Sequence, residues 1–169
     1  AAAAHAGDQD RKARFVQTLL DIADGLEDNA QAVEIFTLVL TTTLLNVGYT
    51  YSIFAREGLD LPFPKIAEAM DRLIDELDES ERAPYFQVMG DLSLSRGGDK
   101  VLHYYERALQ QGILSQQSFE FLDEYYSRNG MNPQRYALLQ KKFTLASESE
   151  KNLILRELYD DLAHALAVS

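Results

Sequence analysis

The sequence predicts an all-α protein of about eight antiparallel helices. Apolar residues recur at helical spacing along most of the chain, whereas no stretch sustains the alternation of period two that marks a strand. The breaks between the helical segments are short, and short connections make consecutive helices antiparallel neighbours. We therefore expect helical hairpins in series, arranged as a stack or as an irregular bundle.

Composition narrows the classes of function. A chain of 169 residues can form one domain with a sizeable core, and we expect a single helical domain over residues 9–169. There is no cysteine, which excludes disulfides, thiolate nucleophiles and cysteine-ligated metals. The net charge of -11 opposes approach to nucleic acid or anionic lipid and favours a basic protein segment as partner, although an acidic surface also serves solubility alone.

The first eight residues lack periodicity, and we expect a disordered tail or a cloning remnant over residues 1–8. Ala4-His5-Ala6 has the small-x-small pattern of a signal-peptidase site, but no basic and apolar region precedes it in the sequence. We therefore favour a cytoplasmic location and keep export to the periplasm as the alternative. An amphipathic helix should follow over residues 9–27, with an apolar face formed by Phe15, Val16, Leu19, Leu20, Ile22, Ala23 and Leu26.

Residues 35–55 contain no charge, which raises the question of a membrane span. Their length would suffice, because about 20 apolar residues cross a bilayer. Threonines, Asn46 and Gly48 dilute the stretch, however, and Arg56 beside Glu57 gives no positive bias at its end. We expect no membrane span but a continuous central helix over residues 31–56, preceded by a cap at Asp28 and packed on several neighbours.

Glycines, prolines and capping residues divide the remainder into six further helices. We expect these helices from Phe63 to Leu77, from Ser80 to Gly97, from Lys100 to Gln111, from Gln116 to Asn129, from Pro133 through Phe143, and after Ser147 through Leu166. Ser147 and Glu150 have the spacing of a capping box at the start of the last one.

A period of 34 residues relates the second half of the chain to itself. The aligned pairs are Tyr85 with Phe119, Val88 with Leu122, Leu92 with Tyr126, Tyr105 with Leu139, and Leu109 with Phe143.

The segment "YFQVMGDLSLSRGGDKVLHYYERAL" resembles a tetratricopeptide repeat, a helix-turn-helix unit with aromatic, leucine, glycine, tyrosine and alanine residues at set positions. The positions that match in type are Tyr85, Val88, Leu92, Tyr105 and Ala108. The departures are Gly90 and Gly97, each one residue late, Val101 in place of a small residue, and Ile113 in place of the closing proline. The resemblance covers mainly residues 85–146 and implies a right-handed stack of hairpins that binds proteins or peptides on its concave face.

The resemblance also implies which residues would contact a partner. The first helix of each unit lines the concave face, at positions that correspond here to Phe86, Gln87, Gly90, Ser93, Leu94, Gln117, Glu120, Phe121, Glu124 and Arg128. Phe86 and Phe121 would be apolar anchors, and Gln87 with Gln117 would hydrogen-bond an extended backbone. Glu120 and Glu124 would select a basic residue. The alternative interpretation is that the phenylalanines belong to the core and the glutamates are only solvated.

Two tyrosine doublets add further candidates. Adjacent helical residues point about 100° apart, so one ring of each doublet should enter the core and the other should reach the surface. We expect Tyr104 and Tyr125 at the surface, where an aromatic ring with a polar tip binds a partner well. Packing between helices would explain both doublets equally.

The sequence holds no set of residues that identifies a reaction, and we expect no enzyme, cofactor or metal site. Asp161 and His164 lie one turn apart, but a metal-binding bundle needs more such ligands. The predicted function is binding without catalysis, by an adaptor, chaperone-like or assembly factor that recognises a protein segment and that can form a homo-oligomer. The alternative is a small-molecule or lipid sensor whose pocket beside the helix over residues 31–56 is lined by Thr41, Asn46, Tyr49 and Tyr51.

Overall fold

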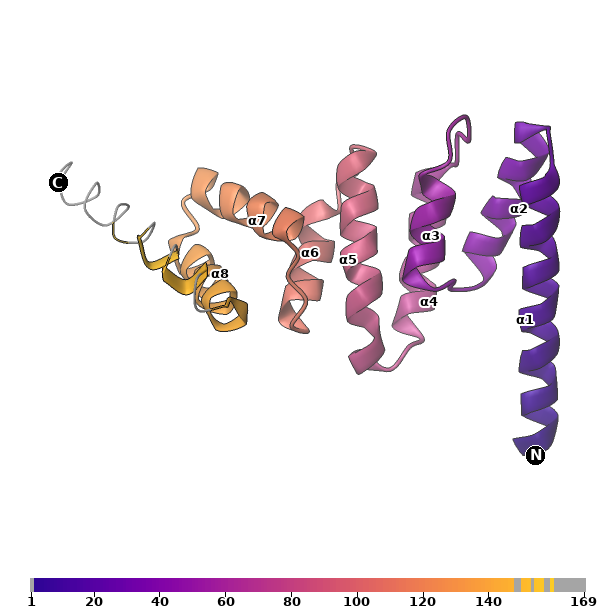
Figure 1. The fold of residues 1–169 in the computed structure, drawn as a ribbon, viewed down its shortest axis with the longest axis horizontal. Helices are drawn as coiled ribbons and strands as arrows, with labels where there is room; N and C mark the ends of the chain where they lie inside the picture. Colours follow the sequence, from indigo (N-terminus) through magenta and orange to yellow (C-terminus); the bar gives the residue numbers. More distant parts are fainter. Residues whose placement is uncertain (1, 148–149, 153, 157–158, 160–169) are drawn as a thin grey trace. The chain divides into compact units, whose positions relative to one another are not determined.

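The computed structural model describes residues 2–147, 150–152, 154–156 and 159, with side chains from residue 10 onward. Over these residues the fold is all-helical, as predicted, and contains no strand (Figure 1). The helices with defined bounds are α1 (Ala2–Gly25), α2 (Asn29–Thr42), α3 (Val47–Phe54), α4 (Phe63–Asp75), α5 (Glu79–Ser95), α6 (Val101–Gln110), α7 (Gln116–Arg128) and α8 (Asn132–Leu145). Residues 150–152 and 154–156 are also helical.

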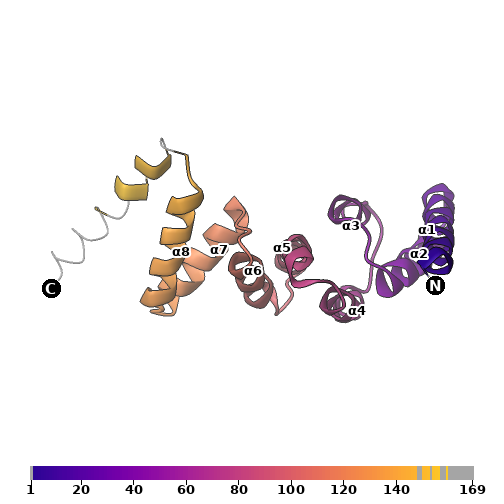
Figure 2. The same cartoon turned by 90° about the horizontal axis from the view of Figure 1, so that it is seen from below.

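The chain groups into two compact units, residues 1–111 with α1 to α6 and residues 112–169 with α7 and α8. Figure 2 shows the first unit in indigo to pink and the second in orange to yellow. From the sequence we expect one domain over residues 9–169, whereas each of the two units has buried apolar residues of its own.

Helix α1 begins earlier than the expected start near residue 9, since residues 2–8 are helical as well. Alanines fill most of the first six positions, and alanine has the highest intrinsic helix propensity. The backbone over residues 2–8 therefore differs from the disordered tail that the lack of periodicity suggests.

The uncharged segment forms two helices, so the prediction of one continuous helix over residues 31–56 is wrong. Helix α2 ends directly before residues 43–46, and helix α3 begins directly after them. Thr41 and Thr42 donate their hydroxyls to carbonyls one turn earlier, both at 2.8 Å, a side-chain bond that competes with regular helical geometry. Asn46 then starts α3, because its side-chain oxygen accepts a backbone N–H of the first turn at 2.8 Å.

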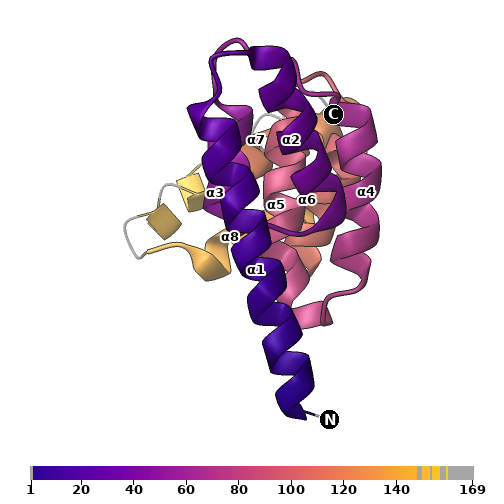
Figure 3. The same cartoon turned by 90° about the vertical axis from the view of Figure 1, so that its right-hand side faces the viewer.

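The core of the first unit forms where α2 packs on α4, and where α3 and α4 pack on α5. Helix α1 lies along α2, as Figure 3 shows. The large side chains that are almost fully buried here include Phe36, Val39, Leu40, Ile53, Ile66, Met70, Ile74 and Met89. Four of these residues come from the uncharged segment. Other helices of the same unit therefore cover much of that segment.

Helices α5 and α6 form the most extensive helix pair of the first unit. Gly90 on α5 permits their close approach, because a Cβ at this position would lie 2.4 Å from two ring carbons of Tyr105 on α6. Any larger residue would overlap that ring, so glycine is required here by contact and not by its backbone angles.

The second unit is built on the hairpin of α7 and α8. Its buried residues include Phe119, Leu122, Tyr126 and Leu138. Asp123 on α7 and Arg135 on α8 form an ion pair across the hairpin, with Nε and Oδ1 2.7 Å apart. The pair joins the two helices at a point where both side chains are only partly exposed.

Side-chain caps mark several helix starts that the sequence indicates. The carboxylate of Asp28 accepts a backbone N–H of α2 at 2.8 Å, and Ser115 forms a reciprocal capping box with Ser118 at the start of α7. At the predicted box of Ser147, the half made by the glutamate is present, since the hydroxyl and the backbone N–H of Ser147 both donate to the Glu150 carboxylate, at 2.6 and 2.8 Å.

We expect Gly90→Ala to destabilise the protein, because the added methyl group overlaps the ring of the fully buried Tyr105. Overpacking of this kind costs about 2 kcal/mol and would lower the Tm by roughly 4–8 °C. Gly25→Ala is the matched control, because no atom lies within 4 Å of the Cβ it adds. Thermal unfolding followed by circular dichroism compares the two variants, and an unchanged Tm of Gly90→Ala would contradict the close packing.

Candidate functional site

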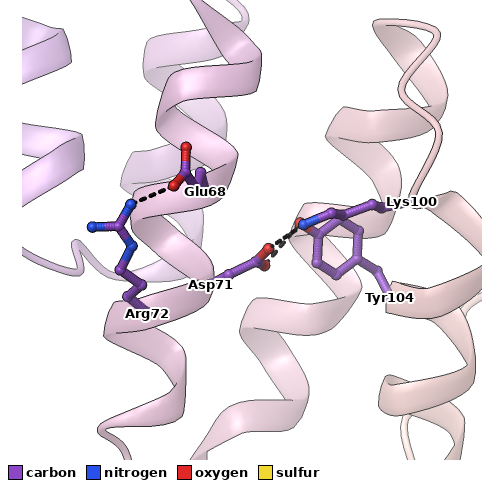
Figure 4. Close-up of polar contacts among 5 residues, drawn as sticks. All are labelled: Glu68, Asp71, Arg72, Lys100 and Tyr104. Carbon is purple, nitrogen blue, oxygen red and sulfur yellow. Dashed lines mark hydrogen bonds and ion pairs between the residues drawn. The ribbon is translucent and has the colours of Figure 1, made fainter.

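Tyr104 lies in the interior of the first unit, which contradicts its predicted surface position. Its side chain is 0% exposed, and its hydroxyl donates to Oδ1 of Asp71 on α4 at 2.8 Å. Lys100 pairs with the second oxygen of Asp71 at 2.7 Å (Figure 4). Asp71 therefore links α4 to α6 through two contacts.

Tyr105 is also buried, and it contacts a different helix. Its hydroxyl donates to Oδ1 of Asp91 on α5 at 2.8 Å, and the amide of Gln87 donates to the same oxygen at 2.9 Å. Burial raises the pKa of Asp91, and burial together with the neighbouring carboxylates raises the pKa of both tyrosines. We interpret the two hydroxyl–carboxylate pairs as structural, because they hold α6 to α4 and to α5.

The α5 residues implied as a binding face are turned inward. Phe86 is 4% exposed and Ser93 is 1% exposed, which contradicts a role for either as a surface contact. The guanidinium of Arg107 on α6 lies 4.9 Å from the centre of the Phe86 ring. Gln87 is half-buried and is engaged with Asp91. This side of α5 packs on α6, so for Phe86 the interpretation as a core residue is the one that holds.

On α7 the implied residues do form an accessible face. We call this surface the α7 face and define it as Gln117, Glu120, Phe121, Glu124, Tyr125 and Arg128. The four polar members are exposed, whereas Phe121 and Tyr125 are half-buried. The two rings stack, with centroids 6.2 Å apart and an angle of 17° between their planes. Tyr125 thus lies at the surface in part, next to a residue implied as an anchor.

The charges of the α7 face are held by exposed partners. Glu124 pairs with Arg128 one turn later, and Gln116 donates to Glu120 at 2.6 Å. Exposed pairs of this kind contribute at most about 1 kcal/mol, so a ligand group can replace either partner. The α7 face therefore combines two aromatic rings with two exposed carboxylates whose present partners a ligand group can replace.

An apolar groove on α8 is not among the predicted sites. It encloses about 420 Å³ and is lined by Tyr136, Leu139, Gln140, Phe143, Thr144 and Leu155. Tyr136 is 60% exposed and Leu155 is 47% exposed. The signal is visible in the sequence, because Tyr136, Leu139 and Phe143 follow helical spacing, but an ordinary core face has the same pattern.

The pocket expected beside the uncharged segment is matched only in part. A cleft of about 410 Å³ in the first unit is lined by residues of α1 from Lys12 to Leu20, by residues 43–46 and by Tyr49. Asn46 and Tyr49 line it as predicted, whereas Thr41 and Tyr51 do not. The cleft lies at the turn of residues 43–46, whereas Thr41 belongs to α2 and Tyr51 to α3.

Metal binding and membrane insertion were also considered for the part of the chain that the structure describes. Within the described residues, no three histidine, aspartate or glutamate side chains gather as a metal ion would require. No helix among them combines the length and the apolar character needed to cross a bilayer. Asp161 and His164 lie outside the described residues. Comparison with protein-family models, with curated proteins and with solved structures finds no match to this chain.

Alkaline pH tests the two buried tyrosines. Tyrosine in an unfolded chain has a pKa near 10, and the fold raises the pKa of both Tyr104 and Tyr105. The two tyrosines therefore contribute their full stabilisation below about pH 10. Above that pH the free energy of unfolding decreases, by up to about 1.4 kcal/mol per pH unit for each tyrosine, until the folded-state pKa is reached. We expect the Tm to fall steeply above about pH 10, and less steeply in Tyr104→Phe/Tyr105→Phe. Tyr136→Phe, which removes a hydroxyl from an exposed ring, is the control, and equal slopes in all three proteins would contradict this interpretation.

Proposed function

We propose that this protein binds a segment of another protein, as an adaptor, chaperone-like or assembly factor, and that the α7 face is its contact surface. The observation that carries the proposal is the stacked pair of Phe121 and Tyr125, half-buried and bordered by exposed Glu120 and Glu124. Accessible aromatic rings are enriched at protein interfaces, and those in the centre of an interface contribute most of the binding energy. No reaction is part of this proposal.

The chemistry of the α7 face favours a segment that carries basic residues. A guanidinium or ammonium group above Phe121 or Tyr125 is attracted by the ring, and Glu120 supplies a nearby negative charge. Because the pair of Glu124 and Arg128 is exposed on both sides, an incoming basic side chain can replace Arg128 at little cost. The net charge of -11 steers such a segment toward the protein.

The resemblance of residues 85–146 to tetratricopeptide repeats remains part of this proposal. Helices α5 with α6 and α7 with α8 form two successive hairpins. Val88 and Leu122, which stand one period of 34 residues apart, are both buried. Tyr105 and Leu139, which also stand 34 residues apart, differ in burial, so the repeat remains a proposal and a binding scaffold is the arrangement that it would serve.

The small-molecule or lipid sensor is the second candidate, favoured by the cleft beside α1. This cleft places the cation of Lys12 next to apolar walls from Val16 and Leu44, with Asn46 and Tyr49 as polar groups. Such a set suits an anionic head group on an apolar chain. A rise in Tm with decanoate that Lys12→Glu removes would favour this candidate.

We expect a fluorescently labelled, extended peptide of alternating arginine and alanine to bind the protein, measured by fluorescence anisotropy. Glu120→Lys/Glu124→Lys should weaken the affinity about tenfold or more, equivalent to about 1.4 kcal/mol, because it reverses both charges of the α7 face. The matched control is Glu34→Lys/Glu57→Lys, which changes the net charge equally at two exposed glutamates of the first unit. Phe121→Ala should also weaken binding.

The two double variants separate a site from a general attraction. Loss of binding in the α7 variant alone supports the proposal. Equal affinity of the wild type and both double variants would contradict a contact at the α7 face. Equal loss in both double variants would show that only the net charge attracts the peptide, and this outcome also contradicts the proposal.

A further inference from the structure

Helix α1 carries an apolar stripe that the described residues leave accessible. Phe15, Leu19 and Ile22 follow at intervals of four and three residues, which aligns them on one side of the helix, and Leu26 comes directly after its last residue, Gly25. Phe15 is 64% exposed and Ile22 is 48% exposed, while Leu19 and Leu26 are half-buried. Helix α1 lies along α2 (Figure 3), and its buried residues Leu20 and Ala23 are not among these four. We call these four residues the α1 stripe.

Charge is segregated from residue 11 to residue 28, along α1 and the turn after its end at Gly25, whereas Asp8 and Asp10 precede the basic residues. Residues 11–20 contain three bases and no acid, whereas residues 21–30 contain four acids and no base. The charged residues are Arg11, Lys12 and Arg14 in the first stretch, and Asp21, Asp24, Glu27 and Asp28 in the second. All seven are exposed. An order of charges like this one is complementary to itself when the helix direction is reversed.

We propose that α1 pairs with α1 of a second copy of this chain in antiparallel orientation and forms a two-fold symmetric dimer. With the axis near Leu19, Phe15 of one copy faces Ile22 of the other, and the two stripes bury each other. The basic stretch of each copy then faces the acidic stretch of its partner. A parallel pair would instead place like charges side by side along the whole contact.

Two contacts within the chain bear on these charges. Asp10 pairs with Arg14 at 3.6 Å, and Asp24 pairs with Arg56 at 2.7 Å. The pair of Asp10 and Arg14 is almost fully solvated, so Arg14 can exchange this partner at little cost.

Other occupants fit the stripe less well than a second copy does. An anionic lipid surface would attract residues 11–20, but the four acids of residues 21–30 would be repelled by it. A partner helix with one sign of charge along its length would gain at one half of α1 and lose at the other. Only a helix with the same segregation of charge, laid in the opposite direction, matches both halves.

Analytical ultracentrifugation over a dilution series tests the dimer. We expect reversible dimerisation of the full chain, and we expect Phe15→Asp/Ile22→Asp to weaken it about tenfold or more. Both side chains are exposed in the single chain, so the Tm measured at low concentration should stay near that of the wild type. Leu38→Asp is the matched control, since Leu38 is an apolar residue of α2 that is 51% exposed and lies outside the stripe.

A charge exchange tests the antiparallel orientation. Arg11→Glu/Arg14→Glu leaves Lys12 as the one base of residues 11–20, and Asp21→Lys/Glu27→Lys leaves two acids, Asp24 and Asp28, in residues 21–30. Each variant alone should dimerise more weakly than the wild type because like charges then face each other. An equimolar mixture of the two variants should form a heterodimer, detected by fluorescence energy transfer between differently labelled chains.

Three outcomes would overturn the proposal. The first is a wild-type chain that sediments as a monomer at every concentration. The second is a dimer that Phe15→Asp/Ile22→Asp leaves intact, which would place the contact elsewhere. The third is a mixture of the charge variants that forms no heterodimer. Binding of a monomeric wild type to vesicles of anionic lipid, lost in Phe15→Asp/Ile22→Asp, would assign the stripe to a membrane surface and would likewise overturn it.

Discussion

Two adjacent tyrosines on α6 determine how three helices of the first unit lie together. Neighbouring helical residues point about 100° apart, so Tyr104 reaches Asp71 on α4 while Tyr105 reaches Asp91 on α5. A buried hydroxyl without a partner costs about 1–3 kcal/mol, so both contacts must form together, and together they set the rotation of α6 about its axis. Gly90 completes the constraint by letting one ring lie against the backbone of α5.

The acidic residues of the protein include a structural kind and an exposed kind. Asp71 and Asp91 are half-buried and accept tyrosine hydroxyls, so their charge serves the packing of the first unit. Glu120 and Glu124 are exposed and have partners that a ligand can replace. The net charge of -11 therefore combines carboxylates that hold helices together with exposed carboxylates on α7.

Most of the helices are predictable from the sequence because amphipathic spacing and caps such as Asp28 and Ser147 are local signals. The break at residues 43–46 is missed because threonine and asparagine are compatible with both a helix interior and a helix end. Tyr104 and Phe86 are misplaced for a different reason. The pattern of one helix shows that it has an apolar side, but it does not show how many of its sides neighbouring helices cover. The exposure of Glu120 and Glu124 is predictable because a charged side chain is seldom buried without a partner.

An antiparallel α1 pair would give the protein a property that a single chain does not have. Each copy contributes one α7 face, so the dimer would present two faces to a partner that carries two basic segments. The second binding event is then intramolecular, and its gain depends on whether the linker between the segments spans the two faces. Such a dimer would bind a partner with two basic segments more tightly than a partner with one. Contacts that are individually weak, as exposed carboxylates and half-buried aromatic rings provide, are then sufficient for selective binding.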